Sequence, residues 1–256
     1  MPESKKYVGN TSAMADTSAC VKDPHGPVML SGPSGIGKYS FLMSRLEAEI
    51  GLESVTSIDA ADGIDSVRSA IESGMSVPDA RYGAIVIRGA ESVSDASQDA
   101  LLKSLEEQPD GTTYFLICDD AGLVRESIKS RIRTHISWHP LSRDELLQIT
   151  NDEFAIGVSF GSAQLCSLAV GDKELRRLYD ACADPQWPSK AIVNPVPSVL
   201  SKEGANAQLI CNVLRLSART SRYANQLLQF SSRISKTPSI NLSNHYLSAA
   251  AAALAV

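Results

Sequence analysis

The segment from Gly32 to Lys38, read Gly-Pro-Ser-Gly-Ile-Gly-Lys, constrains the fold of this 256-residue chain more than any other feature. It fits the pattern G-x-x-x-x-G-K, follows the short apolar run Pro27 to Ser31, and precedes a stretch from Lys38 to Ile50 with helical spacing of its apolar residues. The glycines let backbone N–H groups converge on an anion at a helix N-terminus, and Lys38 adds positive charge. The sequence predicts a strand, a phosphate loop and a helix; a chance glycine-rich turn is the alternative.

The residue after the lysine departs from this pattern. A serine or threonine hydroxyl normally ligates magnesium there, whereas residue 39 is tyrosine. Ser40 comes one place late, and its side chain points about 100° away from that of Tyr39 on a helix. We expect phosphate binding to survive this change and magnesium binding to suffer.

Strand and helix patterns alternate over the first 140 residues, which predicts an α/β fold with a parallel sheet covered by helices on both faces. The further strand candidates are Ser54–Ile58, Gly83–Ile87, Thr113–Cys118 and, more weakly, Thr134–Trp138; the helical stretches between them are Ile64–Ser73 and Ser94–Glu107. Residues 1–26 show little periodicity. They end in a cluster of breakers at residues 23–27, after which an element is expected to start.

Beyond Pro140 only helical patterns occur. The candidates are Ser142–Asn151, two stretches within Ser162–Ala183 broken at Gly171, Ala205–Leu216, Arg222–Ile234 and Leu242–Val256. Breaker-rich connectors at residues 184–188 and 194–197 separate them. We therefore predict a nucleotide-binding domain at 1–140, a small helical domain at 141–186 and a helical C-terminal domain at 187–256.

Composition narrows the class and the compartment. With 43% hydrophobic and 21% charged residues the chain is typical of a packed globular protein. Its longest apolar stretch, near Val256, is too short for a membrane span, and the N-terminus lacks a secretory signal. Five widely spaced cysteines without a C-x-x-C pair suggest neither disulfides nor zinc. We expect a protein that is not secreted, and is cytoplasmic, or nuclear in a eukaryote.

The C-terminal region is basic although the chain carries a net charge of −5. Residues 186–256 hold seven lysines and arginines against a single acid, Glu203. Solvated helical faces are one interpretation, and a surface for nucleic acid or an acidic partner is the other.

The strand Ala84–Ile87 lacks the acids of a nucleotide hydrolase. Such enzymes carry a carboxylate at the end of a buried strand to hold magnesium, often beside a second acid that activates water. Here Arg88 and Gly89 follow the strand. This predicts weak nucleotide binding, or binding without turnover; alternatively Glu91 or Asp119 supplies the missing carboxylate.

Several blocks in a fixed order resemble AAA+ clamp-loader subunits, of the delta-prime or replication factor C small-subunit type. The most specific is Gln98–Glu107, read Gln-Asp-Ala-Leu-Leu-Lys-Ser-Leu-Glu-Glu, after a strand. The other matching blocks are Ile58–Ala61, Val67-Arg68, Ile85–Ile87, Phe115–Ile117 and Ile128–Arg131, together with Val8-Gly9-Asn10, which is similar to the family's adenine-pocket segment.

The resemblance implies a RecA-like ATPase domain, a helical lid, and a C-terminal collar through which subunits form a pentameric ring. In DNA replication such rings use ATP to open a sliding clamp and load it on primer–template DNA. It also implies that ATP or ADP binds this chain, whereas the departures at Tyr39 and Arg88 predict impaired magnesium binding. The implied contact residues are Val8, Gly9, Gly32, Pro33, Ser34, Gly35, Ile36, Gly37, Lys38, Tyr39, Ser40 and the lid's sensor arginine, which is Arg176 if two residues are inserted and is otherwise replaced by Glu174.

Ser130-Arg131-Ile132 resembles the family's serine-arginine-cysteine motif. By that match Arg131 is an arginine finger that acts on nucleotide in a neighbouring subunit; the alternative is a salt bridge to Glu126 or Asp120. Because Arg88-Gly89-Ala90-Glu91 replaces the family's acid-acid-alanine-acid box, we expect a non-motor subunit. An active ATPase working as a homo-oligomer on DNA, and an interaction module that binds neither nucleotide nor DNA, are the competing hypotheses.

Overall fold

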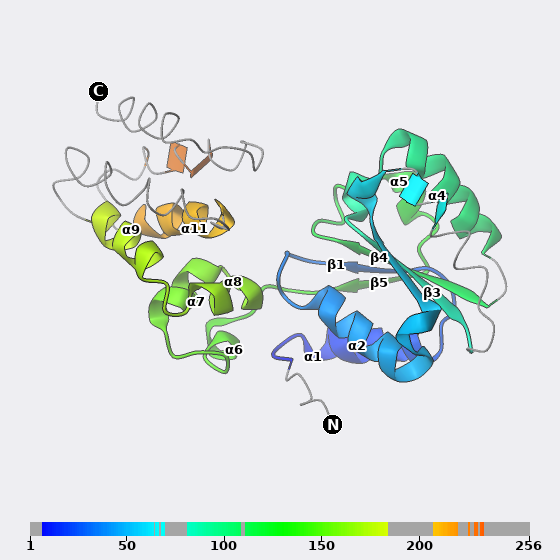
Figure 1. Cartoon of the computed structure of the whole chain (residues 1–256), viewed down its shortest axis with the longest axis horizontal. Helices are drawn as coiled ribbons and strands as arrows, with labels where there is room; N and C mark the ends of the chain where they lie inside the picture. The colour runs from blue at the N-terminus through cyan, green and yellow to red at the C-terminus, as the bar shows by residue number, and fades with distance from the viewer. Residues whose placement is uncertain are drawn as a thin grey trace. The chain divides into compact units, whose positions relative to one another are not determined.

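The computed structural model describes residues 7–63, 65, 66, 68, 69, 81–108, 111–183, 207–219, 225, 228, 229, 231 and 232. The chain divides into two compact units, Met1–Leu141 and Ser142–Val256 (Figure 1). Each unit is treated separately below. Within the described residues, no helix combines the length and the apolar character that crossing a membrane requires.

The first unit is built on a five-stranded sheet in which all pairings are parallel, with the order β2-β3-β4-β1-β5. The parallel α/β fold predicted from the sequence is confirmed. The central strands β3 and β4 are buried almost throughout, as expected for parallel strands covered on both faces. The strands are β1 (Val28–Ser31), β2 (Val55–Asp59), β3 (Gly83–Arg88), β4 (Thr112–Cys118) and β5 (Thr134–Ser137).

Helices cover both faces of this sheet (Figure 1). On one face α1 (Thr11–Lys22) and α2 (Lys38–Ile50) pack against side chains such as Leu30, Val86 and Phe115. On the other face α4 (Asp95–Glu107) packs against Ile85, Ile87 and Leu116. Neighbouring strand residues thus enter opposite cores, because side chains alternate along a strand.

Helix α1 lies within residues 1–26, where the sequence shows little periodicity. Its buried residues are Ala13, Thr17 and Val21, which recur every four positions and lie on one face. Two of the three are small or polar. The apolar signal is therefore weak although the geometry is helical.

The remaining elements of the first unit are short. They are the 3-10 turns η1 (Leu52–Ser54), η2 (Ala60–Asp62) and η3 (Ala90–Ser92), and the helix α5 (Glu126–Lys129). Of the helix predicted at Ile64–Ser73, residues 65, 66, 68 and 69 are described and helical.

The described part of the second unit is entirely helical. Its helices are α6 (Arg143–Leu146), α7 (Glu153–Ser159), α8 (Ala163–Ala169), α9 (Lys173–Ala183) and α11 (Ala207–Ser217). Helix α6 begins with a capping box between Ser142 and Glu145, and α11 packs against α7 and α9. Helix α7 was not predicted. The predicted boundary at residues 186/187, the helix at 242–256 and most of the helix at 222–234 lie outside the described residues.

Candidate nucleotide-binding site

The phosphate-loop motif lies where the carboxyl ends of β1, β3 and β4 meet, which is the usual ligand-binding edge of a parallel α/β sheet. β1 ends at Ser31, and α2 begins at Lys38. Gly32 has φ of 141°, and a Cβ there would lie 2.1 Å from the Trp138 carbonyl oxygen. Only glycine therefore lets the chain turn out of β1 so close to the backbone that follows β5.

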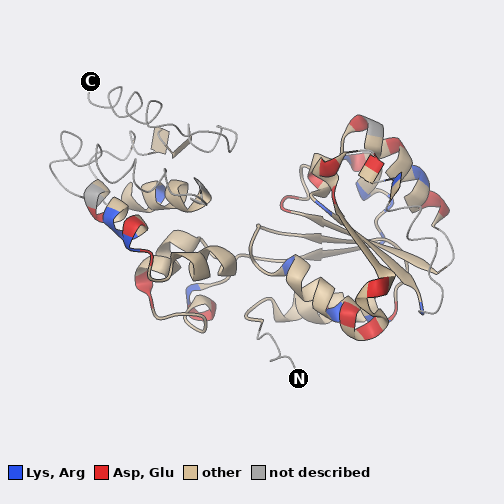
Figure 2. Ribbon diagram, in the orientation of Figure 1, with Lys and Arg blue, Asp and Glu red and all other residues tan. Residues whose placement is uncertain are grey.

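The start of α2 is suited to an anion. Gly37, with φ of 102°, lies between the loop and Lys38, the first residue of α2. The N–H groups of the first helical turn have no acceptor within the helix, and here they lie beside the loop. The first turn of α2 carries no acid, and its acids Glu47 and Glu49 are at its far end (Figure 2). The charge along this helix therefore favours an anion at its N-terminus.

Lys38 is turned into the loop and is only 4% exposed. Its Nζ donates to the carbonyl oxygens of Gly32 and Pro33, the latter at 2.8 Å, and lies 3.3 Å from Asp119 Oδ1. Burial lowers the pKa of Lys38, and the charge of Asp119 opposes that shift. The lysine is held by acceptors of its own chain at the place where a phosphate would compete for it.

Tyr39 and Arg88, which depart from the phosphate-loop pattern in separate parts of the sequence, contact each other. The Arg88 guanidinium carbon lies 5.1 Å from the centre of the Tyr39 ring, a cation–π arrangement. Arg88 Nη2 also lies 3.5 Å from Asp59 Oδ2 at the end of β2, and the Tyr39 hydroxyl lies 3.2 Å from Ser57 Oγ. An aromatic ring and a cation thus stand where magnesium ligands are normally found.

Glu91 and Asp119 both reach this edge of the sheet. Gly89, with φ of 67°, turns the chain after β3. Glu91 Oε1 then accepts the Asp119 backbone N–H at 3.0 Å, while Glu91 Oε2 is buried without a partner in the described residues. Cys118, between β4 and Asp119, is buried, and burial raises its pKa to about 12, so its thiol stays protonated.

These residues fit a polyphosphate and do not fit magnesium. The glycine turns, the helix start and the inward lysine supply what a phosphate group needs. The hydroxyl after the lysine and the acid at the end of β3 are both missing, and Tyr39 and Arg88 occupy their positions. The described residues contain no group of three or more His, Cys, Asp and Glu side chains arranged to hold a metal.

The segment before α1 lies against the same region. The Tyr7 hydroxyl donates to the Ser40 carbonyl oxygen at 2.8 Å, and the Tyr7 ring meets Phe41 edge-on at 5.1 Å. The Asn10 side chain bonds the backbone of His139, donating to its carbonyl oxygen at 2.9 Å and accepting from its N–H at 2.8 Å. Val8 and Gly9, predicted for adenine, are thereby held between α2 and the end of β5.

Arg131 follows α5 on the side of the sheet covered by α4, and 31% of its side chain is exposed. Its ion pair is with Glu106 of α4, through Nε at 2.7 Å and through Nη2. Nη1 donates to the Ser127 carbonyl oxygen at 2.7 Å and to Ser130 Oγ at 3.1 Å. A salt bridge exists, as the alternative interpretation of Arg131 expected, but with a different acid from the two predicted.

Arg176, predicted as the lid's sensor arginine, lies in the second unit. Its Nη2 donates to both carboxylate oxygens of Asp152, each at 2.8 Å, and its guanidinium lies 5.1 Å from the centre of the Phe154 ring. Burial alone would raise the pKa of Asp152. Hydrogen bonds from the Ala155 N–H, Arg176 and the Phe154 N–H together lower it. Arg176 thereby ties the start of α7 to α9.

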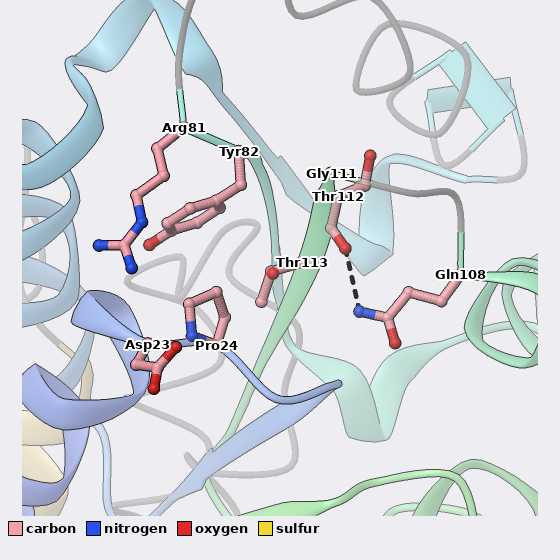
Figure 3. A pocket seen from close by; sticks show the side chains of 8 residues that line it. All are labelled: Asp23, Pro24, Arg81, Tyr82, Gln108, Gly111, Thr112 and Thr113. Atoms are coloured by element: carbon pink, nitrogen blue, oxygen red, sulfur yellow. Dashed lines mark hydrogen bonds between the residues drawn. The ribbon is translucent and has the colours of Figure 1, made fainter.

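A polar cavity of about 460 Å³ lies at the opposite, amino-terminal edge of the sheet (Figure 3). None of its lining residues belongs to the predicted site. The Gln108 amide donates to the Thr112 carbonyl oxygen at 3.0 Å, and the Tyr82 hydroxyl donates to the Val21 carbonyl oxygen at 2.5 Å. The cavity is lined by Asp23, Pro24, Arg81, Tyr82, Gln108, Gly111, Thr112 and Thr113.

Comparison with known proteins agrees with this geometry. The family model described as DNA polymerase III, delta subunit, matches residues 52–139. Replication factor C subunit 2 of Arabidopsis thaliana is 29% identical over 134 residues, which are 48% of this chain and 40% of that protein. Replication factor C subunit 4 of Schizosaccharomyces pombe is 28% identical over 179 residues, which are 64% of this chain and 52% of that protein. Over about half of its length the chain is therefore similar in sequence to clamp-loader subunits.

Solved structures of similar fold support the architecture of the chain. A DNA polymerase III gamma subunit-related protein of Thermotoga maritima superposes with a TM-score of 0.59 at 13% identity, covering 94% of this chain and 98% of that one. The RuvB Holliday junction branch migration motor of the same organism gives 0.54 at 14% identity, covering 98% and 83%. The chain spans about half the length of the curated relatives it matches.

Motif reasoning found the loop residues but missed their partners. Asp119, Asp59 and Glu106 carried no motif that linked them to Lys38, Arg88 and Arg131. Asp119 and Asp59 share one signal, since each follows or ends a strand at the carboxyl edge of the sheet. Glu106 is part of the specific block on α4, but a helical block does not show which loop it faces.

Proposed function

We propose that this chain is a subunit of a sliding-clamp loader that works in a ring with other loader subunits. In this proposal its own loop holds ATP or ADP without turning it over, and Arg131 acts on nucleotide held by the adjacent subunit. The ring opens a clamp and places it on primer–template DNA, in the cytoplasm, or in the nucleus of a eukaryote. The C-terminal helices serve as the collar that joins the subunits.

The observation that carries the proposal is the Tyr39–Arg88 contact at the phosphate loop. A hydrolysing site of this kind needs a metal between the phosphates and a carboxylate. An arginine cannot ligate a metal cation, and a tyrosine at position 39 carries its hydroxyl to Ser57 on β2. The loop itself is intact, which supports retention of nucleotide binding.

The state of Arg131 supports its action on another chain. It lies after α5, and its guanidinium is partly exposed. Its four side-chain hydrogen bonds to described residues go to Glu106 of α4 and to Ser127 and Ser130 of the α5 region. They fix the direction of a side chain that carries charge at any working pH.

Replacing Arg131 with alanine tests the role in trans. In the assembled complex we expect Arg131→Ala to lower ATP turnover about 10-fold or more, since arginine fingers stabilise transition-state charge. The affinity of the isolated chain for nucleotide should stay unchanged. Lys129→Ala, which removes a partly exposed cation from the end of α5, two residues before Arg131, is the matched control and should have little effect. Unaltered turnover in the Arg131 variant would rule out this role.

Glu91 favours one competing function, an active ATPase that works as a homo-oligomer on DNA. Its Oε2 is buried and unpartnered in the described residues, so it is available to a cation or a water molecule. Steady-state turnover of the purified chain separates the two functions. Magnesium-dependent hydrolysis that Lys38→Met abolishes would support the homo-oligomeric ATPase. Absence of both hydrolysis and nucleotide binding would instead support the pure interaction module.

A further inference from the structure

The positions that normally hold magnesium in a phosphate-loop protein form a single packed unit here. One is the residue after the loop lysine, Tyr39, and the other is the residue that ends β3, Arg88. The Arg88 guanidinium carbon lies 5.1 Å from the centre of the Tyr39 ring, and Arg88 Nη2 lies 3.5 Å from Asp59 Oδ2. A cation held between an aromatic face and a carboxylate excludes a second cation from the same corner by charge repulsion.

Lys38 and Arg88 both lie at the carboxyl edge of the sheet, and each forms an ion pair with a different carboxylate. Lys38 is paired with Asp119 at 3.3 Å, and Arg88 is paired with Asp59. Both carboxylates are solvent-accessible, with side chains 55% and 37% exposed. Pairs with one exposed member are weak, so a ligand with several negative charges can take the place of both carboxylates.

We propose that this site binds the polyphosphate of a nucleotide without a divalent cation, and that Arg88 supplies the positive charge that magnesium supplies in other phosphate-loop proteins. The inference rests on the nucleotide-holding role proposed above and assigns its chemistry. The ligand is a metal-free nucleoside di- or triphosphate. Its phosphates exchange with Asp119 at Lys38 and with Asp59 at Arg88.

The chemistry of Arg88 suits this task. A guanidinium presents a planar array of N–H donors that matches phosphate oxygens, and it keeps its charge at any working pH. The side chain is 45% exposed at the last position of β3, so solvent and ligand can reach it. Tyr39 directly follows Lys38 at the start of α2. Because the Arg88 guanidinium stacks on the Tyr39 ring, Lys38 and Arg88 both lie near the N-terminal end of this helix.

The competing ligand for a metal is Glu91. Its Oε1 is committed to the Asp119 N–H, and a single remaining carboxylate oxygen gives magnesium little of the oxygen coordination that it requires. Asp119 already neutralises Lys38. The structure therefore favours a cation from the protein over a bound metal.

Equilibrium binding of fluorescent ATP and ADP to the purified full chain tests the inference. We expect the affinity of the unmodified protein to differ by less than about 3-fold between excess magnesium and excess EDTA, because the described residues at the loop offer no set of magnesium ligands. Inorganic tripolyphosphate should compete in EDTA. Arg88→Ala should lower the affinity in EDTA about 10-fold or more, the usual effect of losing a charge-assisted contact.

Matched variants keep the test independent of folding. Arg81→Ala removes an exposed arginine just before the same strand, at its opposite end, and should leave binding unchanged. Arg88→Lys keeps the charge and should retain most of the affinity lost in Arg88→Ala. Replacing Tyr39 with threonine and Arg88 with aspartate together should create magnesium dependence, so that EDTA weakens binding about 10-fold.

Several results would overturn the inference. One is a 10-fold or greater loss of affinity when EDTA replaces magnesium in the unmodified protein, above all if Glu91→Gln removes that dependence. Absence of nucleotide binding in both conditions is another. The first result leaves the nucleotide-holding role of the proposed function intact and removes only the metal-free chemistry, whereas the second removes both. The response of complex turnover to Arg131→Ala tests the role in trans separately, so the failures are distinguishable.

Discussion

Two cationic regions of the first unit differ in how their charge is placed. At the phosphate loop Lys38 is 4% exposed and faces the loop of its own chain, with Asp119 as partner. Just after α5, the Arg131 side chain is 31% exposed, and its ion-pair partner is Glu106 of α4. Both are neutralised internally, but only the first is enclosed by the turns that would hold a ligand.

The difference separates holding a nucleotide from acting on one. A buried lysine among loop carbonyls can bind phosphate only within this chain. A partly exposed arginine that follows α5 and pairs with α4 can meet a group that belongs to another molecule. Lys38 and Arg131 have no hydrogen-bond or ion-pair partner in common among the described residues. Loss of the magnesium ligands near Lys38 therefore need not change the contacts of Arg131.

The largest effect is expected at Gly32. A methyl group there would overlap the Trp138 carbonyl, and φ of 141° is unfavourable for alanine. Gly32→Ala should lower the free energy of unfolding by about 2–5 kcal/mol, measured by urea denaturation. Gly111→Ala is the control: its φ is 76°, but nothing lies within 4 Å of its added Cβ. If the two variants lose equal stability, the contact with Trp138 is unimportant.

Lys38→Met should separate the two regions most clearly. It removes the ammonium and keeps most of the buried stem, so nucleotide affinity should fall about 10- to 100-fold while the fold persists. Isothermal calorimetry measures the affinity, and the far-ultraviolet spectrum checks the fold. Any effect of Arg131 on the assembled complex should persist in the Lys38 variant. A joint loss of both would show that the regions are coupled.

Asp119→Asn should have a smaller effect of opposite sign. It removes the internal anion from Lys38, so nucleotide affinity should rise about 2- to 5-fold, in line with the small free energy of a partly exposed ion pair. Asp120→Asn, one residue along, is the control, because the Asp120 side chain accepts the N–H of Gly122 and makes no described contact with Lys38. A fall in affinity would instead mean that Asp119 helps to hold the ligand.

Glu106→Gln should produce the smallest change. It weakens the ion pair that orients Arg131, and we expect a loss of about 0.5–1 kcal/mol in the free energy of unfolding. Glu107→Gln alters an exposed pair with Lys103 at 4.0 Å and should cost less. In the assembled complex, Glu106→Gln should lower turnover less than Arg131→Ala does. An equal loss of stability in the two glutamine variants would leave Glu106 no special part in orienting the arginine.

The sheet was predictable because each buried strand is a short apolar run with a turn signal beside it. Helix α2 was predictable for a similar reason, since its apolar residues recur at helical spacing. Helix α7 contains Gly157 and begins at an Asp152 cap, and it is too short to establish a period. The weak apolar signal of α1 has the same consequence. Local pattern identifies an element only when the buried face is large and apolar.

The site was predictable only in part, for a different reason. The loop, the missing acid at Arg88 and the motif at Arg131 are contiguous in sequence. The partners are not: Lys38 meets Asp119, and Arg131 meets Glu106, across strands and helices far apart in the chain. Sequence separation hides such pairs because strand order, and not distance along the chain, decides which residues meet.

The contact between Gly32 and the chain after β5 has a mechanical consequence. The Trp138 N–H donates to the Ser31 carbonyl oxygen at 2.7 Å. The Asn10 side chain hydrogen-bonds both the N–H and the carbonyl oxygen of His139. The first unit ends at Leu141. Residues 138–141, which follow β5 and end the first unit, are therefore held against Ser31 and Gly32 at the start of the phosphate loop. A displacement of Gly32 would therefore press on the Trp138 carbonyl oxygen and move the residues that lead to the end of the first unit.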